Sequence, residues 1–181
     1  ILRVASTSKT LCTLALGVVH TVAFDDLPDF PPAQLGRFPG LCRLWESSYT
    51  PTCSRAQFAA LTTLTTLCFG GSTEPIADAD VMFRTRLVDL HFRYTTAITD
   101  AGLVPLTRLE TLEMGENTLI TDASIARLTR LTSLDFCSNG NITDAALVLL
   151  TRLVELRMGG NTNITDASFA ALTQLTELEL V

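Results

Sequence analysis

The stretch LETLEMGENTLITDASIARLTR, from Leu109 to Arg130, decides the fold because its pattern recurs at a fixed interval. The next stretch, LTSLDFCSNGNITDAALVLLTR, begins 22 residues later at Leu131. Leucines hold the first position, and isoleucines followed by Thr-Asp hold a later one; the two series are Leu87, Leu109, Leu131, Leu153, Leu175 and Ile98, Ile120, Ile142, Ile164. A period of this length is typical of a solenoid, in which each repeat contacts only its neighbours.

Looser units precede these repeats and begin at Leu11, Leu41 and Leu64. The last two span 23 residues, whereas the first spans 30 because of a predicted proline-rich insertion over 27–39. We therefore expect one domain over 1–181, with irregular repeats over 11–63 and regular repeats from 64 onward. The chain stops inside a predicted strand without a polar capping repeat, so we expect it to belong to a longer protein.

The pattern resembles the leucine-rich-repeat family, whose core LxxLxLxxN precedes a variable convex segment. The resemblance extends from Leu11 to Val181 and is strongest after Leu87. It implies an α/β solenoid, or horseshoe, with a concave parallel β-sheet and short convex helices. The Ile-Thr-Asp-Ala element is similar to the cysteine-containing repeats of F-box proteins, whereas the repeat length is closer to internalins and phosphatase regulatory subunits. No subfamily follows from these two features.

Within each unit, apolar and polar residues alternate as in a strand with one buried face. The predicted inward residues include Leu112, Met114, Leu134 and Phe136. Asn117, Asn139 and Asn161 hold the family's asparagine position, where a buried amide satisfies backbone groups. Thr95, Ser72 and Tyr49 replace asparagine in earlier repeats, so this ladder should form best toward the C-terminus.

Two charged rows follow from stacking the repeats. The aspartates are Asp78, Asp100, Asp122, Asp144 and Asp166, and the arginines are Arg86, Arg108, Arg130 and Arg152. The aspartates are interpreted as caps of their own helices, with a calcium-binding row as the alternative. The arginines are interpreted as residues at helix C-termini, with a docking stripe for an acidic partner or a phosphate group as the alternative.

The concave sheet is the expected binding surface, as in other repeat proteins of this shape. Its predicted central outward row is Ala15, Trp45, Cys68, His91, Glu113, Asp135, Arg157 and Glu179. The candidate partner-binding residues are Trp45, Asp89, His91, Arg93, Glu113, Asp135, Glu155 and Arg157. A solvated face without a partner is the alternative interpretation of these mixed charges.

Trp45 is the only tryptophan, and tryptophan is enriched at binding hot spots. The strict register would bury Glu46 beside it, so a strand bulge that turns Trp45 into the core is the alternative. His91 and Cys68 form the only nucleophile arrangement that the stacked pattern suggests, and a solvent-facing imidazole is favoured over it.

Composition and motifs argue against other functional classes. The chain carries 13 basic and 19 acidic residues, and this net charge of −6 argues against sequence-independent nucleic-acid binding. No run approaches the ~20 apolar residues that span a bilayer. The phosphate loop and the HExxH, GxSxG and dinucleotide motifs are all absent from the sequence. We therefore expect no enzyme activity, no cofactor and no metal.

The compartment stays undetermined, with the cytoplasm favoured by reduced cysteines. Glycosylation signatures at Asn141 and Asn163, and an apolar stretch over 11–24, point instead to secretion. A disulfide between Cys12 and Cys42 is the alternative to reduced thiols.

The leading functional hypothesis is a non-enzymatic scaffold that binds a partner protein on its concave sheet. The alternative is a regulatory or adaptor segment of a larger protein, such as a substrate receptor or a receptor ectodomain.

Overall fold

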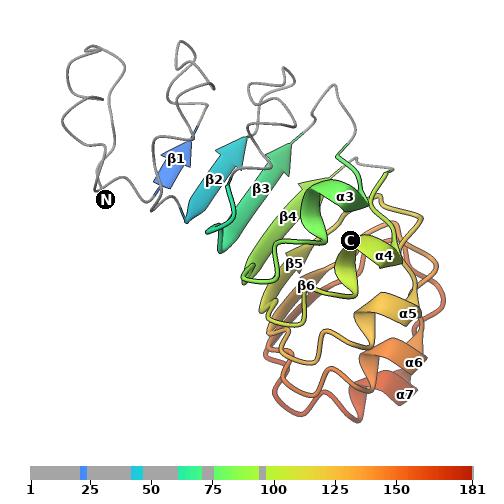
Figure 1. The fold of residues 1–181 in the computed structure, drawn as a ribbon. Helices are drawn as coiled ribbons and strands as arrows, with labels where there is room; N and C mark the ends of the chain where they lie inside the picture. Colours follow the sequence, from blue (N-terminus) through green and yellow to red (C-terminus); the bar gives the residue numbers. More distant parts are fainter. Residues whose placement is uncertain (1–20, 24–41, 47–60, 71–75, 94–96, 181) are drawn as a thin grey trace, which may run out of the picture.

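A computed structural model describes residues 21–23, 42–46, 61–70, 76–93 and 97–180. The described strands form one parallel sheet whose order follows the chain (Figure 1). They are β1 Thr21–Ala23, β2 Arg43–Glu46, β3 Thr66–Gly70, β4 Asp89–Arg93, β5 Thr111–Glu113, β6 Ser133–Asp135, β7 Glu155–Arg157 and β8 Glu177–Glu179. Helices stack in a second layer beside the sheet: α3 Asp78–Val81, α4 Asp100–Leu103, α5 Asp122–Ile125, α6 Asp144–Leu147 and α7 Asp166–Phe169. The predicted leucine-rich-repeat solenoid is confirmed.

The strand register agrees with the stacked pattern from Trp45 onward. Trp45 pairs with Cys68, Cys68 with His91, and His91 with Glu113. The first repeat differs, because Ala23, and not Ala15, is the partner of Trp45. The overlooked signal is Val19-x-x-Val22-x-Phe24, which precedes Leu41 by the regular 22 residues. The stretch over 27–39 is therefore no insertion into a longer unit, although its own structure lies outside the described residues.

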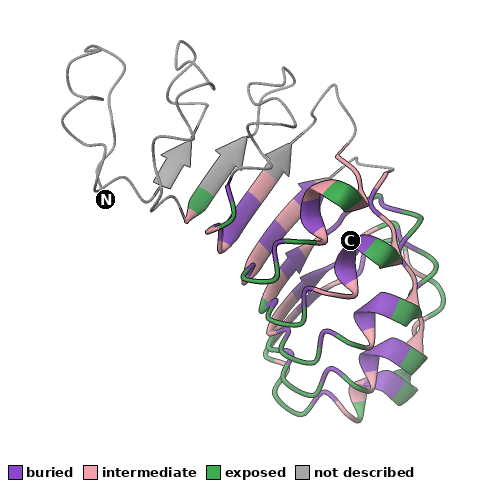
Figure 2. Cartoon of the chain, in the orientation of Figure 1, coloured by how far each residue is buried: buried purple, intermediate pink, exposed green. Residues whose placement is uncertain are grey.

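The core lies between the sheet and the helices (Figure 2). Leu112, Met114, Leu134 and Phe136 are fully buried, as the strand alternation predicts. Isoleucines and leucines from the convex segments, such as Ile120 and Leu128, close the core from the other side. A single repeat has no second apolar layer of its own, so this core exists only because neighbouring repeats stack.

The predicted asparagine ladder is present in the described repeats. The Asn117 side-chain amide donates to the carbonyl of Ile98 at 3.0 Å, and that of Asn139 donates to Ile120 at 3.1 Å. Asn161 donates to Ile142 at 3.2 Å, and its Oδ1 accepts from the amide of Asn163. Each asparagine thus satisfies buried backbone groups of its own turn and of the preceding repeat. Residues 49, 72 and 95 lie outside the described residues.

The residue before each asparagine has a left-handed backbone conformation. Its φ is 65° at Glu116, 61° at Ser138 and 72° at Gly160. Only glycine adopts this region without a steric cost, so the first two positions carry backbone strain.

The aspartate row makes a different contact from the predicted one. The helix N-caps are threonines, each accepting from the amide two residues on; they are Thr99, Thr121, Thr143 and Thr165. Each aspartate accepts bonds from the amide N and Oγ1 of the next threonine, at 2.6–2.9 Å, in the pairs Asp78–Thr99, Asp100–Thr121, Asp122–Thr143 and Asp144–Thr165. The prediction that these aspartates cap their own helices is wrong, because stacking brings the neighbouring cap within reach. We call this arrangement the aspartate–threonine ladder.

The arginine row lies beyond the helices. Helix α4 ends at Leu103, whereas the arginine of this repeat is Arg108, and the last turns of α3–α7 contain no basic residue. The helix macrodipole acts within the last turn. The interpretation of these arginines as helix C-terminal residues is therefore wrong.

Candidate functional site

The outward side of the sheet presents two rows of mostly polar residues. The central row runs through Cys68, His91, Glu113, Asp135, Arg157 and Glu179. The preceding row runs through Thr66, Asp89, Thr111, Ser133, Glu155 and Glu177. Of the predicted site residues, the described backbone brings all eight onto this face. The side chains of Trp45 and Arg93 lie outside the description, so the predicted alternatives for Trp45 stay open.

Side-chain contacts on β3–β5 hold the first half of this face in place. Thr66 Oγ1 donates to Asp89 Oδ2 across adjacent strands at 2.8 Å. His91 Nδ1 lies 3.2 Å from Glu113 Oε1, and their side chains are 17% and 27% exposed. Each contact joins successive repeats, so the polar residues are ordered and still reachable from solvent.

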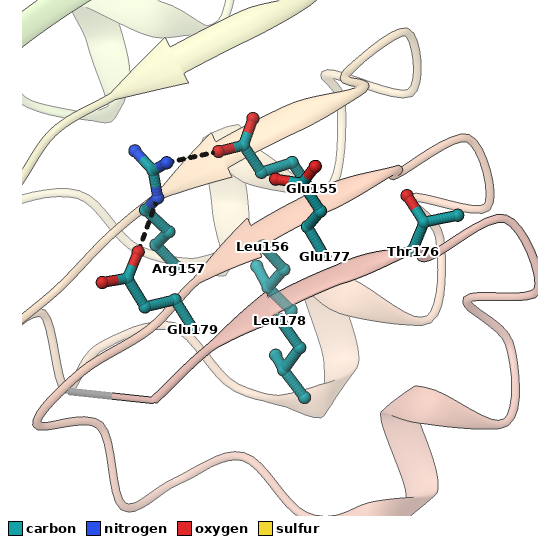
Figure 3. A pocket seen from close by; sticks show the side chains of 7 residues that line it. All are labelled: Glu155, Leu156, Arg157, Thr176, Glu177, Leu178 and Glu179. Atoms are coloured by element: carbon teal, nitrogen blue, oxygen red, sulfur yellow. Dashed lines mark ion pairs between the residues drawn. The ribbon is translucent and has the colours of Figure 1, made fainter.

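Arg157 is the centre of the second half (Figure 3). Its guanidinium contacts Glu155 on the same strand at 2.7 Å and Glu179 on the neighbouring strand at 2.8 Å. Glu155 contributes most to raising the pKa of Arg157; Glu179, Asp135 and Glu113 add to the rise, and desolvation opposes it. Glu155 also accepts from the Ser133 hydroxyl at 3.1 Å. Arg157 is therefore a neutralised cation and not a free positive contact.

Asp135 occupies its predicted position but is only 5% exposed. Its Oδ1 accepts from the amide of Cys137 at 3.1 Å, two residues along the chain. The strand pattern places Asp135 on the outward face, whereas its burial depends on neighbouring side chains. As a partner contact, Asp135 is less accessible than Glu113, Glu155 and Arg157.

A hollow of about 340 Å³ lies on β7 and β8 around Arg157 (Figure 3). Its walls are Glu155, Leu156, Arg157, Thr176, Glu177, Leu178 and Glu179. Sequence inspection missed Glu177 and Glu179 as site candidates, although both were visible as outward positions of the last repeat.

The outward residues of β5–β8 are predominantly acidic. The carboxylates belong to Glu113, Asp135, Glu155, Glu177 and Glu179, and the one described cation among these strands' outward residues is Arg157. The predicted mixed patch is thus acidic in its C-terminal half. Oxygen-rich as it is, no group of three or more residues suited to hold a metal ion occurs in the described residues.

Cys68 and His91 are register partners on β3 and β4. The ion-pair contact of His91 is with Glu113, so its imidazole is oriented by a carboxylate on the next strand. No described helix is long and apolar enough to cross a membrane.

No family model matches this chain, and no curated protein matches it. Solved structures do match. Internalin C2 from Listeria monocytogenes is 26% identical, with a TM-score of 0.67 over 81% of this chain and 64% of that one. The TLR13–ssRNA13 complex is 18% identical, with a TM-score of 0.62 over 83% of this chain and 26% of that one. The Drosophila Toll–Spätzle complex is 17% identical, with a TM-score of 0.64 over 89% of this chain and 23% of that one.

The matched region therefore covers less than two thirds of each of these neighbours. Their shared architecture supports the repeat assignment, and their partners belong to those proteins.

Proposed function

Because this chain is a leucine-rich-repeat protein, we propose that it binds a partner protein on the concave face of β4–β8. The role is non-enzymatic: the face recognises a surface and performs no reaction. Contact residues on this face are His91, Glu113, Glu155, Arg157, Glu177 and Glu179.

The observation that carries the proposal is the ordering of polar side chains before any partner binds. His91 is held by Glu113, and Arg157 is held between Glu155 and Glu179. Side chains that are already fixed lose less conformational entropy on binding, so more of the contact energy contributes to affinity. A merely solvated face would not need contacts that cross from strand to strand.

The Toll–Spätzle complex supports a protein partner, since a chain of similar architecture is there in complex with one. The TLR13–ssRNA13 complex provides a nucleic-acid alternative. The carboxylates on β5–β8 oppose that alternative here, because RNA phosphates would meet negative charge. A protein surface that carries basic side chains is better matched to this half of the face.

Affinity capture tests the proposal with the intact chain and a double charge reversal, Glu113→Lys with Glu177→Lys. The matched control is Glu110→Lys with Glu116→Lys, which makes the same charge change at exposed positions outside the strands. The captured protein is then purified, and its affinity for all three chains is measured by calorimetry.

We expect binding to survive in the control and to fall by about tenfold or more in the concave variant, as for the loss of two interfacial charge contacts. Equal affinity for both folded variants would exclude the concave face as the contact surface. Equal loss in both would indicate a response to net charge alone and would also contradict the proposal.

A further inference from the structure

A turn of constant geometry precedes each of the strands β4–β8. In each turn a leucine amide donates to the carbonyl three residues earlier at 2.9–3.1 Å, in the pairs Leu87–Arg84, Leu109–Leu106, Leu131–Leu128, Leu153–Leu150 and Leu175–Leu172. The two central residues are Thr-Arg in the first four turns and Thr-Gln in the fifth: 85–86, 107–108, 129–130, 151–152 and 173–174. We call Arg86, Arg108, Arg130 and Arg152 the arginine row.

The core anchors these turns rigidly. Leu106 and Leu109 are fully buried on either side of Arg108, and Leu128 and Leu131 are fully buried on either side of Arg130. The central threonines and arginines between them are exposed. The backbone that carries the row is therefore held in place before anything binds, which lowers the entropic cost of binding.

The row concentrates like charge along one edge. Its members occupy equivalent positions in consecutive repeats, whose strands lie about 4.8 Å apart. In the described part of the chain, no ion pair involves any of the four, in contrast to Arg157, which is held by two carboxylates. One carboxylate, Glu110, lies close in sequence; the equivalent positions hold Val88, Thr132, Val154 and Thr176.

Neighbouring cations repel one another, and neither a helix dipole nor an internal carboxylate offsets this row as the aspartate–threonine ladder offsets its own charges. The repeats stack without needing it, because Gln174 occupies the same turn position in the last repeat. The row therefore has a composition that stacking does not explain.

We propose that the arginine row is a second docking surface, which binds a short acidic polypeptide segment in extended form. Alternate side chains of an extended chain project on one side about 6.6–6.8 Å apart, a spacing that long arginine side chains on successive repeats can follow. A guanidinium binds a carboxylate through two parallel hydrogen bonds, and the neighbouring threonine hydroxyl supplies a further donor. A continuous polyanion is less well matched, because it would extend past four arginines onto a chain whose net charge is −6.

The test uses a fluorescein-labelled peptide of four Glu-Thr dipeptides, with the Gln-Thr peptide as its control, and measures anisotropy against the intact chain. Arg108→Gln with Arg130→Gln removes the centre of the row. Arg127→Gln is the matched control, an exposed arginine next to the row but outside it. Gln174→Arg extends the row by one repeat.

We expect the double variant to bind the acidic peptide about tenfold more weakly, since each exposed pair contributes up to a few-fold. Gln174→Arg should bind more tightly, Arg127→Gln should bind as the native chain does, and added salt should weaken binding. The concave variant Glu113→Lys with Glu177→Lys should retain peptide binding, so failure at either surface is distinguishable from failure at the other.

Equal binding of the Gln-Thr peptide, or equal losses in the double variant and Arg127→Gln, would overturn the proposal. A heparin oligosaccharide or a single-stranded oligonucleotide that binds the row more tightly than the acidic peptide would also overturn it in favour of that class of ligand.

Discussion

Asp100 on α4 accepts two hydrogen bonds from Thr121 of the following repeat, from the amide at 2.9 Å and from Oγ1 at 2.7 Å. Thr121 Oγ1 in turn accepts from the amide of Ala123 and so caps α5. One carboxylate thereby positions the residue that begins the next helix. This link between repeats is a cross-repeat contact, which sheet hydrogen bonds alone would not provide on the convex side.

Replacing Asp100 with Asn should destabilise the chain by about 1–3 kcal/mol, because an amide donor then faces the donors of Thr121. Urea unfolding followed by circular dichroism measures this change. Asp166→Asn is the control, since Asp166 has no partner threonine in a following repeat among the described residues. Equal destabilisation by both substitutions would contradict a role for the ladder.

Acid should weaken the fold through the same ladder. Burial raises the pKa of Asp100, but hydrogen bonds from Ser124 and Thr121 outweigh it, and the pKa lies below its ordinary 3.8. The Thr165 hydroxyl and amide lower the pKa of Asp144 in the same way. A carboxylate with a lowered folded-state pKa stabilises the fold above its unfolded pKa and loses this contribution as pH falls through the folded value.

The free energy of unfolding should therefore change little through these groups above about pH 5 and decline below about pH 4. Urea midpoints measured between pH 2.5 and pH 7 check this. The decline should be shallower in Asp100→Asn, and an identical slope in both chains would show that other carboxylates are responsible.

Glycine at the strained turn positions should stabilise the chain. Glu116→Gly and Ser138→Gly place the residue that tolerates a positive φ where Gly160 already has it. Each change should add about 1 kcal/mol, reduced by the greater entropy of glycine in the unfolded chain. Gly160→Ala is the reverse test and should destabilise by a similar amount, measured as a shift in Tm.

Gly102→Ala should disturb the ladder at its first link. A Cβ at residue 102 would lie 2.5 Å from Asp78 Oδ1 and 3.1 Å from a Val81 methyl carbon. The carboxylate of Asp78 must then move away from Thr99, to which it is bonded. We expect a loss of about 1–3 kcal/mol, despite the higher helix propensity of alanine.

Ala146→Gly is the matched comparison for that change, since α6 carries alanine at the equivalent position. It should cost about 1 kcal/mol through helix propensity and lost packing. A stabilised Gly102→Ala chain would show that Asp78 can shift without losing its bonds.

Periodicity alone predicted the sheet, the inward leucines and the asparagine ladder. These features repeat at fixed positions, and each depends on local alternation or on a single residue type, as Leu112 and Asn139 illustrate. The outward rows followed from the same register, so most of the candidate site was predicted as well. Stacking from Trp45 onward needed no information beyond the repeat length.

Other features depend on which side chains meet between repeats, and a linear pattern does not contain that information. Ala23, and not Ala15, pairs with Trp45 because backbone pairing, and not the first leucine-rich motif, selects the strand. Asp100 reaches Thr121 because the next repeat lies one strand spacing away, closer than an unpaired end of its own helix. Asp135 is buried, and Arg157 is neutralised by Glu155 and Glu179, because neighbouring strands bring their side chains together.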